Sequence, residues 1–553
     1  MAGNEALDAE DRYKSVVEST NEYIERFDIL ETINNVGNDE VFTPRKVVDA
    51  MLDALPSEVW HNPDYRWLNP ATKTGIFERE IAIRLDDGLK DAIPDVEVRR
   101  KHILQNMLFS IGQTKFTSNV ARRTLYYCCQ ANRACDGIKS DDGHYVNGYA
   151  IGNGTWFDNP EGNVKTPCSE HVMDKKGKKC IFCGISKDSK YLDANQREKY
   201  SYDFIHVKPG FDLQSTLSER FFKGDKEVKF DIIIGNPPYH LSTIDKGTQA
   251  TPIYQKFAMQ AFSLNPKYVS MIMPSKWFAG GMACLDGFRE YMRTCGKIRY
   301  IVDYANAKDC FPSNSLGGGV NYFLWDRDYN GPCEFTNILA DNKNTAIRHL
   351  DELPILVRYN KSLSILQKVL EKKEPTIDEI TSSLSPFGLP TNYRGCKEKD
   401  QDHPVKLYSS NDITYIGVDE VDKDEGCLEN YKVIVGKIGA EHALEPDKNG
   451  QFRIITNSMK VIAPKEACTH SYFTIGNFDE KAYADNLYKY MKTKFVRFLI
   501  LQSMTAPNLS KRVLIFVPQQ DFSKSYTDED LYEKYGLTKD EIAYVEGLMK
   551  EMD

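Results

Sequence analysis

The residues best suited to chemistry follow directly after the apolar segment Phe230–Ile234, which is typical of a buried β-strand. Asn236, Pro237, Pro238 and Tyr239 come next. Two consecutive prolines cannot continue a strand or donate backbone hydrogen bonds, so they predict a rigid turn with free carbonyl oxygens. The Asn236 side-chain oxygen and the Pro237 carbonyl oxygen can then accept both hydrogens of one amino group. Such acceptors push the lone pair of a ring-conjugated amine back onto nitrogen, and a tyrosine face gives the flat ring a stacking platform.

This run resembles, without a mismatch, the Asn-Pro-Pro-Tyr motif of S-adenosylmethionine-dependent amino-methyltransferases. The resemblance implies that Asn236 and Pro237 orient the target amine and that Pro238 fixes the turn. It also implies that the methyl group passes directly from the sulfonium, with no covalent enzyme intermediate. The alternative interpretation is an Asn-Pro turn that only closes a strand.

The loop within Trp67–Phe77 resembles the cofactor loop written Asp-Pro-Ala-Cys-Gly-Ser-Gly in adenine methyltransferases. In that family a glycine lets the backbone approach the methionine part of the cofactor, and the next helix N-terminus favours its carboxylate. Two departures stand out, because Asn69 replaces the usual acid and Lys73 replaces the first glycine, which leaves Gly75 alone. We therefore expect a functional loop whose affinity for the cofactor is altered.

Three further segments match cofactor elements of the family. Phe42-Thr43-Pro44, at the start of a predicted helix, resembles the element that closes over the methionine moiety. Taken alone, this triplet is a common helix start, with Thr43 as N-cap and Pro44 at the first helical position. The strand that should end in a ribose-binding acid ends in Gln113 instead, and an Asp-Phe pair resembles the adenine-binding element. The predicted cofactor-binding residues are Phe42, Thr43, Pro44, Asn69, Pro70, Ala71, Gly75, Gln113, Asp203 and Phe204.

The resemblance also predicts a pocket for a base that is turned out of the duplex, because the target amine is inaccessible inside paired DNA. Val269–Phe278 resembles the strand and turn that wall this pocket. Phe311 stands where the family places a ring that stacks on the base opposite Tyr239. The alternative for Phe311 is an ordinary core aromatic.

The order of these motifs, with a long C-terminal region after them, is that of gamma-type adenine-specific DNA methyltransferases of restriction–modification systems. The resemblance implies a site-specific enzyme that transfers a methyl group from S-adenosylmethionine to a flipped adenine in double-stranded DNA. It also implies that any cleavage or translocation belongs to a separate restriction subunit, a helicase or nuclease. Two alternatives stay open: an amino-methyltransferase acting on RNA or protein glutamine, and a catalytically weak DNA-recognition subunit that keeps the fold.

A separate signal lies in a Cys-, Gly- and Asn-rich stretch. The Cys-x-x-His and Cys-x-x-Cys pairs Cys168, His171, Cys180 and Cys183 have the ligand types and spacing of a structural zinc site. Such a stretch has too few apolar residues for its own core, so a metal would stabilise it. Free thiols are the alternative, and Cys128, Cys129 or Cys135 could replace one ligand.

Composition agrees with these predictions and limits the location of the protein. The chain has 553 residues, 41% of them hydrophobic and 27% charged, which is typical of a globular protein of several domains. No stretch is apolar enough to cross a membrane, and thirteen cysteines without a secretory signal predict reduced thiols in the cytoplasm. The net charge of −9 means that DNA must meet a locally basic face, or that a partner supplies positive charge.

The predicted fold is α/β, a Rossmann-like methyltransferase domain with a mixed, mostly parallel seven-stranded sheet, a zinc-stapled insertion and a C-terminal α+β target recognition domain. We place a helical extension at 1–40, the catalytic domain at 41–355 with its insertion at 128–200, the recognition domain at 356–520 and a helical tail at 521–553. A helical pattern is predicted over Lys481–Ser503, and Thr493–Leu501 within it reads like a closing helix. Candidate DNA contacts in the C-terminal region are Lys437, Arg453, Lys460, Lys494, Arg497, Lys511 and Arg512, although a solvated face is the ordinary role of any one of them.

Overall fold

The computed structural model describes residues 41–126, 161–168, 171–188, 202–207, 212–224, 229–240, 251–280, 282–312, 316–340, 342–438, 444, 446–455 and 458–552. The predicted helical extension at 1–40, and Cys128, Cys129 and Cys135, lie outside these residues. The chain divides into two compact units. The first comprises Met1–Met273, Gly296–Ile301 and Tyr322–Gly331, and the second comprises Pro274–Cys295, Val302–Asn321 and Pro332–Asp553.

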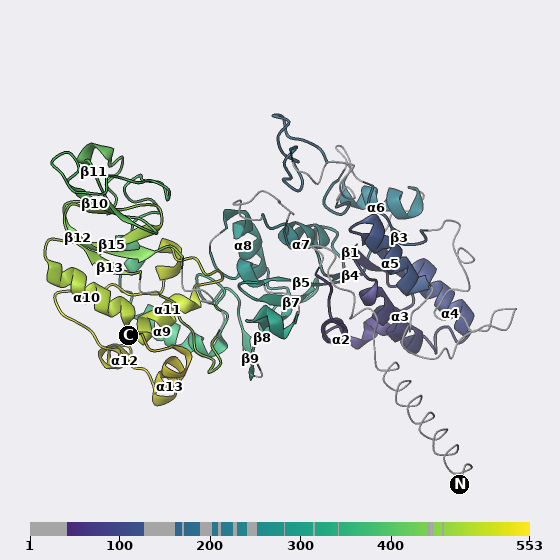
Figure 1. Cartoon of the computed structure of the whole chain (residues 1–553). Helices are drawn as coiled ribbons and strands as arrows, with labels where there is room; N and C mark the ends of the chain where they lie inside the picture. Colours follow the sequence, from purple (N-terminus) through teal and green to yellow (C-terminus); the bar gives the residue numbers. More distant parts are fainter. Residues whose placement is uncertain are drawn as a thin grey trace, which may run out of the picture. The chain divides into compact units, whose positions relative to one another are not determined.

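The main sheet has nine strands among the described residues, in the order β3-β2-β1-β4-β5-β7-β6-β8-β9 (Figure 1). The strands are β1 (Trp67–Thr72), β2 (Leu108–Gly112), β3 (Val164–Lys165), β4 (Ile232–Gly235), β5 (Tyr268–Pro274), β6 (Ile298–Tyr304), β7 (Val320–Asp326), β8 (Cys333–Leu339) and β9 (Asn342–Arg348). The predicted number of seven is too small, because 333–348 folds into an antiparallel hairpin, β8-β9, that continues the sheet beyond β6.

The central strands position the chemistry. β1 pairs in parallel with β2 on one side and with β4 on the other, and β4 pairs in parallel with β5. All residues of β1, β2 and β4 are buried, as expected for strands covered on both faces. Because parallel strands end at the same edge of a sheet, the segments that follow β1, β2 and β4 meet there. That edge is where an α/β fold binds its ligands.

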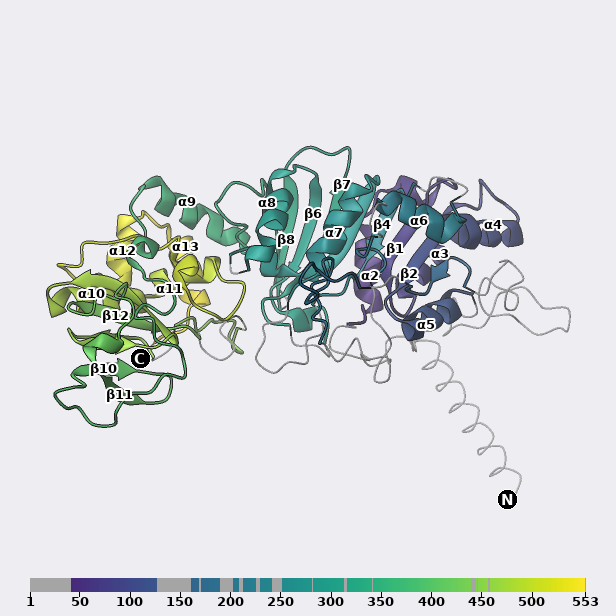
Figure 2. The same ribbon diagram turned by 90° about the horizontal axis from the view of Figure 1, so that it is seen from above.

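Helices cover this sheet in the first unit (Figure 2). They are α2 (Arg45–Asp53), α3 (Ile76–Gly88), α4 (Val96–His102), α5 (Lys115–Tyr126), α6 (Leu213–Phe222) and α7 (Tyr254–Ser263). Both α3 and α5 pack on β1, and they also pack on each other. The α3 N-terminus therefore lies at the carboxyl end of β1, where its unpaired backbone N–H groups favour a negatively charged ligand group.

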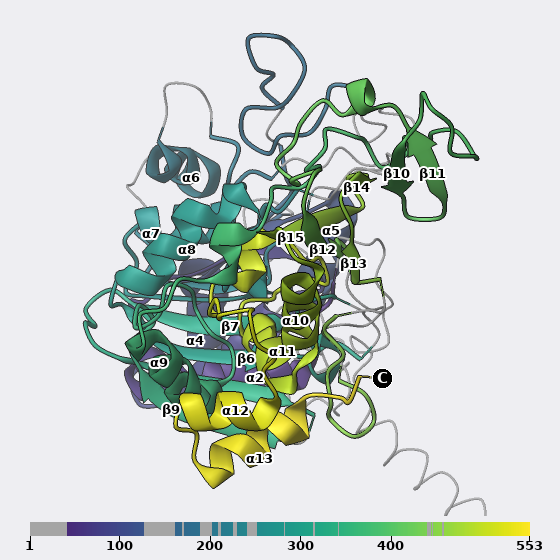
Figure 3. The same cartoon turned by 90° about the vertical axis from the view of Figure 1, so that its left-hand side faces the viewer.

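The second unit holds most of the C-terminal region (Figure 3). Its further elements are α8 (Asp286–Thr294), α9 (Leu363–Glu371), β10 (Val405–Tyr408), β11 (Ile413–Ile416), β12 (Tyr431–Gly436), β13 (Lys460–Ile462), β14 (Glu466–Cys468), β15 (Tyr472–Phe478), α10 (Lys481–Lys492), α11 (Lys494–Gln502), α12 (Asp528–Lys534) and α13 (Lys539–Leu548). Two small sheets, β11-β10-β14 and β13-β12-β15, stand beside the helices. Side chains of α9 to α13 join β12 and β15 in one large apolar core.

The helical pattern predicted over 481–503 is confirmed; it forms two helices, α10 and α11, which are divided at Thr493, where the closing helix Thr493–Leu501 was expected to begin. Thr493 has an extended ψ of 149°, and its side chain accepts a hydrogen bond from the backbone N–H of Val496. A threonine in this N-cap role starts a new helix in a new direction.

Two of the predicted DNA contacts are instead used inside the second unit. The Arg497 guanidinium is buried and donates to the backbone carbonyls of Lys492, Thr493 and Lys550. Lys494 forms ion pairs with Glu546 and Glu551. Both side chains therefore hold α11 to the C-terminal residues.

Candidate active site

A pocket opens in the first unit at the carboxyl end of the central strands. Three segments that are distant in sequence contribute to it: the Phe-Thr-Pro element, the loop between β1 and α3, and the residue that follows β4. Its lining residues are Phe42, Thr43, Asn69, Ala71, Thr72, Lys73, Thr74, Gly75, Ile76, Phe77, Glu78 and Asn236. The structure thus brings together five predicted cofactor residues and the predicted catalytic asparagine.

The orientation of the Asn236 carboxamide follows from its partners. Its Nδ2 donates to the backbone carbonyl oxygen of Val41 at 3.0 Å and to Thr43 Oγ1 at 3.0 Å. A carbonyl oxygen only accepts, so the Asn236 atom that faces Val41 must be the nitrogen. Asn236 Oδ1 is buried and has no hydrogen-bond partner among the described residues. The side chain is therefore held by its nitrogen, with its oxygen left to accept from a ligand.

The rest of the motif is buried at the end of β4. Pro237 and Pro238 are buried, and Tyr239 is 3% exposed. The Tyr239 carbonyl oxygen accepts a hydrogen bond from the N–H of Ile253, which ties the turn to the segment before α7. The proline turn predicted from the sequence is therefore fixed at both ends, by β4 and by this hydrogen bond.

Thr43 has a different role from the helix cap that a Thr-Pro pair ordinarily provides. The helix α2 begins at Arg45, its N-cap is Pro44, and no side chain caps it. The Thr43 hydroxyl accepts from Asn236 instead. The Phe-Thr-Pro element thus contacts the Asn-Pro-Pro-Tyr motif directly.

The loop between β1 and α3 is fixed by its unusual residues. Asn69 Oδ1 accepts from the backbone N–H of Ala71 at 3.1 Å, and Lys73 Nζ donates to the Val41 carbonyl oxygen at 2.9 Å. The same carbonyl oxygen accepts from Asn236, so Lys73 joins the loop to the Phe-Thr-Pro element. Pro70 is buried within β1.

Gly75 is required for a reason that the sequence did not indicate. It is the N-cap of α3 with φ of +80°, and a Cβ atom there would lie 2.9 Å from the Ala121 Cα atom of α5. The missing side chain at Gly75 therefore leaves room for α5 and also permits the positive φ of the loop. Gly235 is needed in the same way, since a Cβ atom there would lie 2.4 Å from Asn69 Oδ1.

Several buried polar atoms at this edge of the sheet have no hydrogen-bond partner among the described residues. They are Thr72 Oγ1, both carboxyl oxygens of Glu78, Ser110 Oγ, both amide atoms of Gln113, and Asn236 Oδ1. Buried polar groups are normally paired, so a cluster of unpaired ones indicates a ligand that is rich in donors and acceptors. S-adenosylmethionine has an ammonium, a carboxylate, ribose hydroxyls and a base amine, and this donor and acceptor set fits it.

Glu78 was missed by sequence reasoning. It lies in the first turn of α3, lines the pocket and is 2% exposed. Burial raises the pKa of its carboxyl above the ordinary value of 4.5, and nearby Thr72 lowers that pKa by less. Glu78 is the first of three consecutive charged residues, Glu78, Arg79 and Glu80, and nothing in the sequence distinguished it from the other two.

Asp203 and Phe204, the predicted adenine-binding pair, do not line the pocket. The Asp203 carboxylate accepts from the backbone N–H of Cys168 at 3.0 Å and pairs with Arg220 at 3.5 Å. Phe204 is fully buried and stacks on Phe257 of α7. In the structure both side chains connect the segment 202–207 to its neighbours.

Phe311, the second predicted stacking ring, belongs to the second unit. It is 1% exposed, and its backbone N–H donates to the Ala307 carbonyl oxygen. Its predicted contact with a target base stays a prediction.

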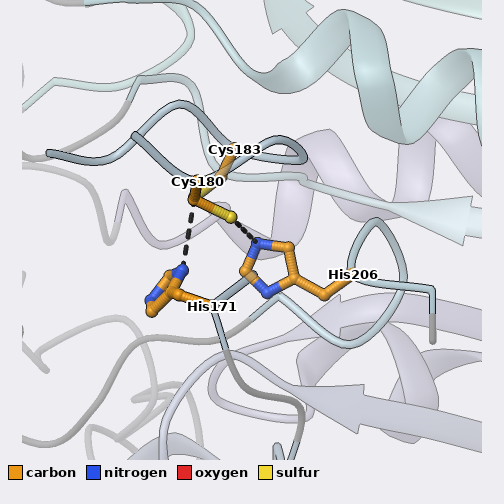
Figure 4. A group of neighbouring side chains, drawn as sticks. All are labelled: His171, Cys180, Cys183 and His206. Carbon is orange, nitrogen blue, oxygen red and sulfur yellow. Dashed lines mark hydrogen bonds between the residues drawn. The ribbon is translucent and has the colours of Figure 1, made fainter. Parts of the chain in front are cut away.

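A separate group of side chains has the make-up of a metal site (Figure 4). One ligand atom each from His171, Cys180, Cys183 and His206 lies within 4.8 Å of the others. Cys180 Sγ is 3.9 Å from His206 Nε2, and Cys183 Sγ is 3.5 Å from His171 Nδ1. Ligand atoms around a tetrahedral zinc are about 3.4–3.8 Å apart, so this donor set fits one. Three of the four predicted ligands thus come together.

The fourth predicted ligand, Cys168, is exposed and outside this group, and His206 takes its place. Nothing in the spacing of the two Cys-x-x pairs indicated His206, which follows Asp203 in a different segment. A hydrogen bond with Cys183 lowers the pKa of the Cys180 thiol, with smaller effects from the two histidines. The same interaction, together with burial, raises the pKa of Cys183.

No helix among the described residues is both long enough and apolar enough to span a membrane.

Comparisons with known proteins place these observations in a family. The family model of the Eco57I restriction-modification methylase matches residues 106–311. An uncharacterized adenine-specific methylase of Mycoplasma pneumoniae is 48% identical over 315 residues, which cover 56% of this chain and 72% of that relative.

Among solved structures, the Type IIL restriction-modification enzyme MmeI in complex with DNA has a TM-score of 0.45 at 10% identity, with 91% of this chain and 72% of MmeI covered. The Type ISP enzyme LlaBIII bound to DNA has a TM-score of 0.41 at 12% identity, with 79% of this chain covered but only 33% of LlaBIII. The family match and the relative together show that this chain belongs to the Eco57I-type family of restriction-modification, adenine-specific methylases.

Proposed function

We propose that this chain methylates the exocyclic amine of an adenine that has been turned out of double-stranded DNA at a specific site. The observation that carries the proposal is the Asn236 carboxamide, whose nitrogen is held by Val41 and Thr43 and whose oxygen has no partner among the described residues. A second acceptor is the carbonyl oxygen of Pro237. Two acceptors aimed at one amine stabilise the positive charge that develops on it as it attacks.

The chemistry needs no nucleophile from the protein. S-adenosylmethionine supplies a methyl group on a sulfonium. As the bond between the adenine nitrogen and the methyl carbon forms, the bond from that carbon to sulfur breaks, and the extra proton on nitrogen then leaves to solvent. Asn236 and Pro237 orient the amine in this step, while Tyr239 stacks on the base and Pro238 keeps the turn rigid.

Residues of the described pocket would hold the cofactor. Phe42 and Thr43 and the loop residues Asn69, Ala71 and Gly75, which line the pocket, would surround the methionine end, with Pro44 and Pro70 next to them in the chain. Gln113, at the carboxyl end of β2, has an unpaired buried amide that can both donate to and accept from ribose hydroxyls. A contact of Asp203 and Phe204 with the adenine of the cofactor is also part of this proposal.

A structural zinc ion is the second expected ligand. His171, Cys180, Cys183 and His206 would hold it, and four protein ligands leave no open position for catalysis. The metal would join the loop 171–187 to the segment 202–207. That segment also carries Asp203, so the ion would stabilise the part of the insertion that the structure describes.

We propose two partners for this chain. The first is double-stranded DNA, which a target recognition domain at 356–520 would read, with the helices of 521–553 after it. The second is a separate helicase or nuclease subunit that would carry out restriction. The remaining basic candidates, Lys437, Arg453, Lys460, Lys511 and Arg512, are those available for DNA. The relevant compartment is the cytoplasm, where the host genome and reduced thiols are found. A second candidate function, a recognition subunit with weak catalysis, is favoured by Asn69, Lys73 and Gln113, which depart from the cofactor motifs.

The decisive experiment compares Asn236→Ala with wild type in single-turnover methylation of cognate DNA, after the site has been found by sequencing DNA from expressing cells. Loss of one oriented acceptor should reduce the rate by about 10²–10³-fold while DNA binding persists. Asn106→Ala, at an exposed asparagine, is the matched control and should keep full activity. Asn236→Ala activity within about threefold of wild type would contradict the catalytic assignment. A wild-type protein that binds the cofactor and DNA but transfers nothing would favour the recognition subunit.

A further inference from the structure

Glu78 is a buried acid whose ordinary partners are absent. It is 2% exposed, and neither carboxyl oxygen has a hydrogen-bond partner among the described residues. The cations near it pair with another acid, because Arg79 and Arg45 both contact Glu80, at 2.7 Å and 3.4 Å. Lys73 donates to a backbone carbonyl oxygen. Within the part of the chain that the structure describes, no cation pairs with the Glu78 carboxyl.

A buried carboxylate without a partner, such as that of Glu78, destabilises the folded state. An unpaired carboxylate in the interior costs several kcal/mol in desolvation, so proteins keep one only where something compensates. The hydroxyl groups of Thr72 and Ser110 face Glu78, but neither makes a hydrogen bond of normal geometry with it. Buried acids of this kind gather at functional sites, and Glu78 also lines the pocket.

We propose that Glu78 binds the α-ammonium group of S-adenosylmethionine and supplies a negative charge at the methionine end of the pocket, where Asn69 has none. This inference rests on the proposed function. It deepens that function by adding a specific cofactor-binding residue, one that lies outside the Asp-Pro-Ala-Cys-Gly-Ser-Gly loop and was not predicted from the sequence.

The position within the pocket selects the ammonium over the ribose. Glu78 shares the pocket with Thr43 and Asn236, and Asn236 orients the amine that receives the methyl group. The sulfonium must lie close to that amine, and the ammonium is on the same amino-acid chain as the sulfonium. Gln113, the predicted ribose contact, does not line this pocket.

The same arrangement gives the α-ammonium and the α-carboxylate of the cofactor's methionine part different partners. The first backbone N–H groups of α3, just after Gly75, favour the α-carboxylate. Glu78 lies in the first turn of that helix and would face the ammonium. The hydroxyls of Thr72 and Ser110 can then donate to the Glu78 carboxylate, which gives all three groups a partner.

The test is a comparison of two ligands by calorimetry. S-adenosylhomocysteine carries the ammonium, whereas 5′-methylthioadenosine keeps the adenine and ribose but lacks the amino-acid part. Glu78→Gln keeps the volume and removes the charge. We expect it to weaken S-adenosylhomocysteine by about tenfold or more and to leave 5′-methylthioadenosine within about twofold. Glu97→Gln, at an exposed acid of α4, is the control and should change neither affinity.

The outcomes are distinguishable. Equal weakening of both ligands would assign Glu78 to the ribose and overturn the inference, as would an unchanged affinity for S-adenosylhomocysteine. If Glu78→Gln does not fold, Glu78→Asp takes its place, because aspartate keeps the negative charge while its shorter side chain moves the carboxylate away from the ligand. A selective loss of affinity for S-adenosylhomocysteine then supports the inference in the same way. A wild-type protein that binds neither ligand would instead refute the proposed cofactor, and the Glu78 assignment with it.

Discussion

The contact between Thr43 and Asn236 joins two motifs that lie 193 residues apart, and it predicts a specific kinetic defect. In Thr43→Val the hydroxyl becomes a methyl group of similar size, so Asn236 Nδ2 loses one of its two acceptors. Only the Val41 carbonyl oxygen remains, at 3.0 Å. One N–H of a buried amide is then unpaired, and the carboxamide is held less firmly.

The size of the defect follows from the cost of that unpaired group. Leaving a buried donor without an acceptor costs about 1–3 kcal/mol. If the whole loss falls on the transition state, the rate falls by about 5- to 150-fold, because about 1.4 kcal/mol corresponds to a factor of ten. We expect a value near tenfold, since the bond to Val41 still favours the correct orientation.

Single-turnover methylation at saturating cofactor measures this change directly, and calorimetry separates it from any loss of cofactor affinity, since Thr43 also lines the pocket. Thr43→Ser keeps the hydroxyl and should remain within about twofold of wild type. The reasoning is refuted if Thr43→Val turns over as fast as wild type, or if Thr43→Ser is as slow as Thr43→Val. Melting curves should confirm that both variants are folded.

Three further predictions concern the metal, the loop and the buried acid. His206→Ala should remove the zinc that purified protein carries at about one ion per chain, whereas Cys168→Ala should retain it; metal analysis showing the reverse would restore Cys168 as the ligand. Gly75→Ala should lower the free energy of unfolding in denaturant titrations by about 2 kcal/mol or more, through its positive φ and a clash with α5, while Gly177→Ala, with positive φ but open space, should cost less. Burial raises the pKa of Glu78, so its ionisation destabilises the fold as pH rises above 4.5. Without cofactor, Glu78→Gln should therefore have a higher melting temperature than wild type at pH 7, and this difference in melting temperature should shrink toward pH 4.5. A gain that grows on acidification would show that the sign is wrong.

The sequence was sufficient where short runs of residues carry the information. Asn236–Tyr239 after an apolar strand predicted the position of β4 and of the turn that follows it, because a strand, a polar residue and two prolines leave few conformations. The same holds for β5 (Tyr268–Pro274), which matches the strand expected within Val269–Phe278. Knuckle spacing predicted three of the four residues of the metal group.

Elements whose existence depends on distant packing were less predictable. The β8-β9 hairpin was not expected as part of the main sheet, since its pairing with β6 cannot be read from its own residues. By contrast, the division of 481–503 at Thr493 is local, because the Thr493 side chain caps α11 by accepting a hydrogen bond from the backbone N–H of Val496.

The sequence by itself therefore determined which residue types are present and the local turns that display them. Only the tertiary structure decided their partners: Thr43 orients Asn236, Glu78 has no hydrogen-bond partner among the described residues, His206 completes the metal group, and Asp203 faces Cys168 and Arg220. The physical reason is that a local motif fixes backbone angles over a few residues, whereas burial and hydrogen-bond pairing depend on which strand ends the sheet order brings to one edge. Sequence separation carries no information about that neighbourhood.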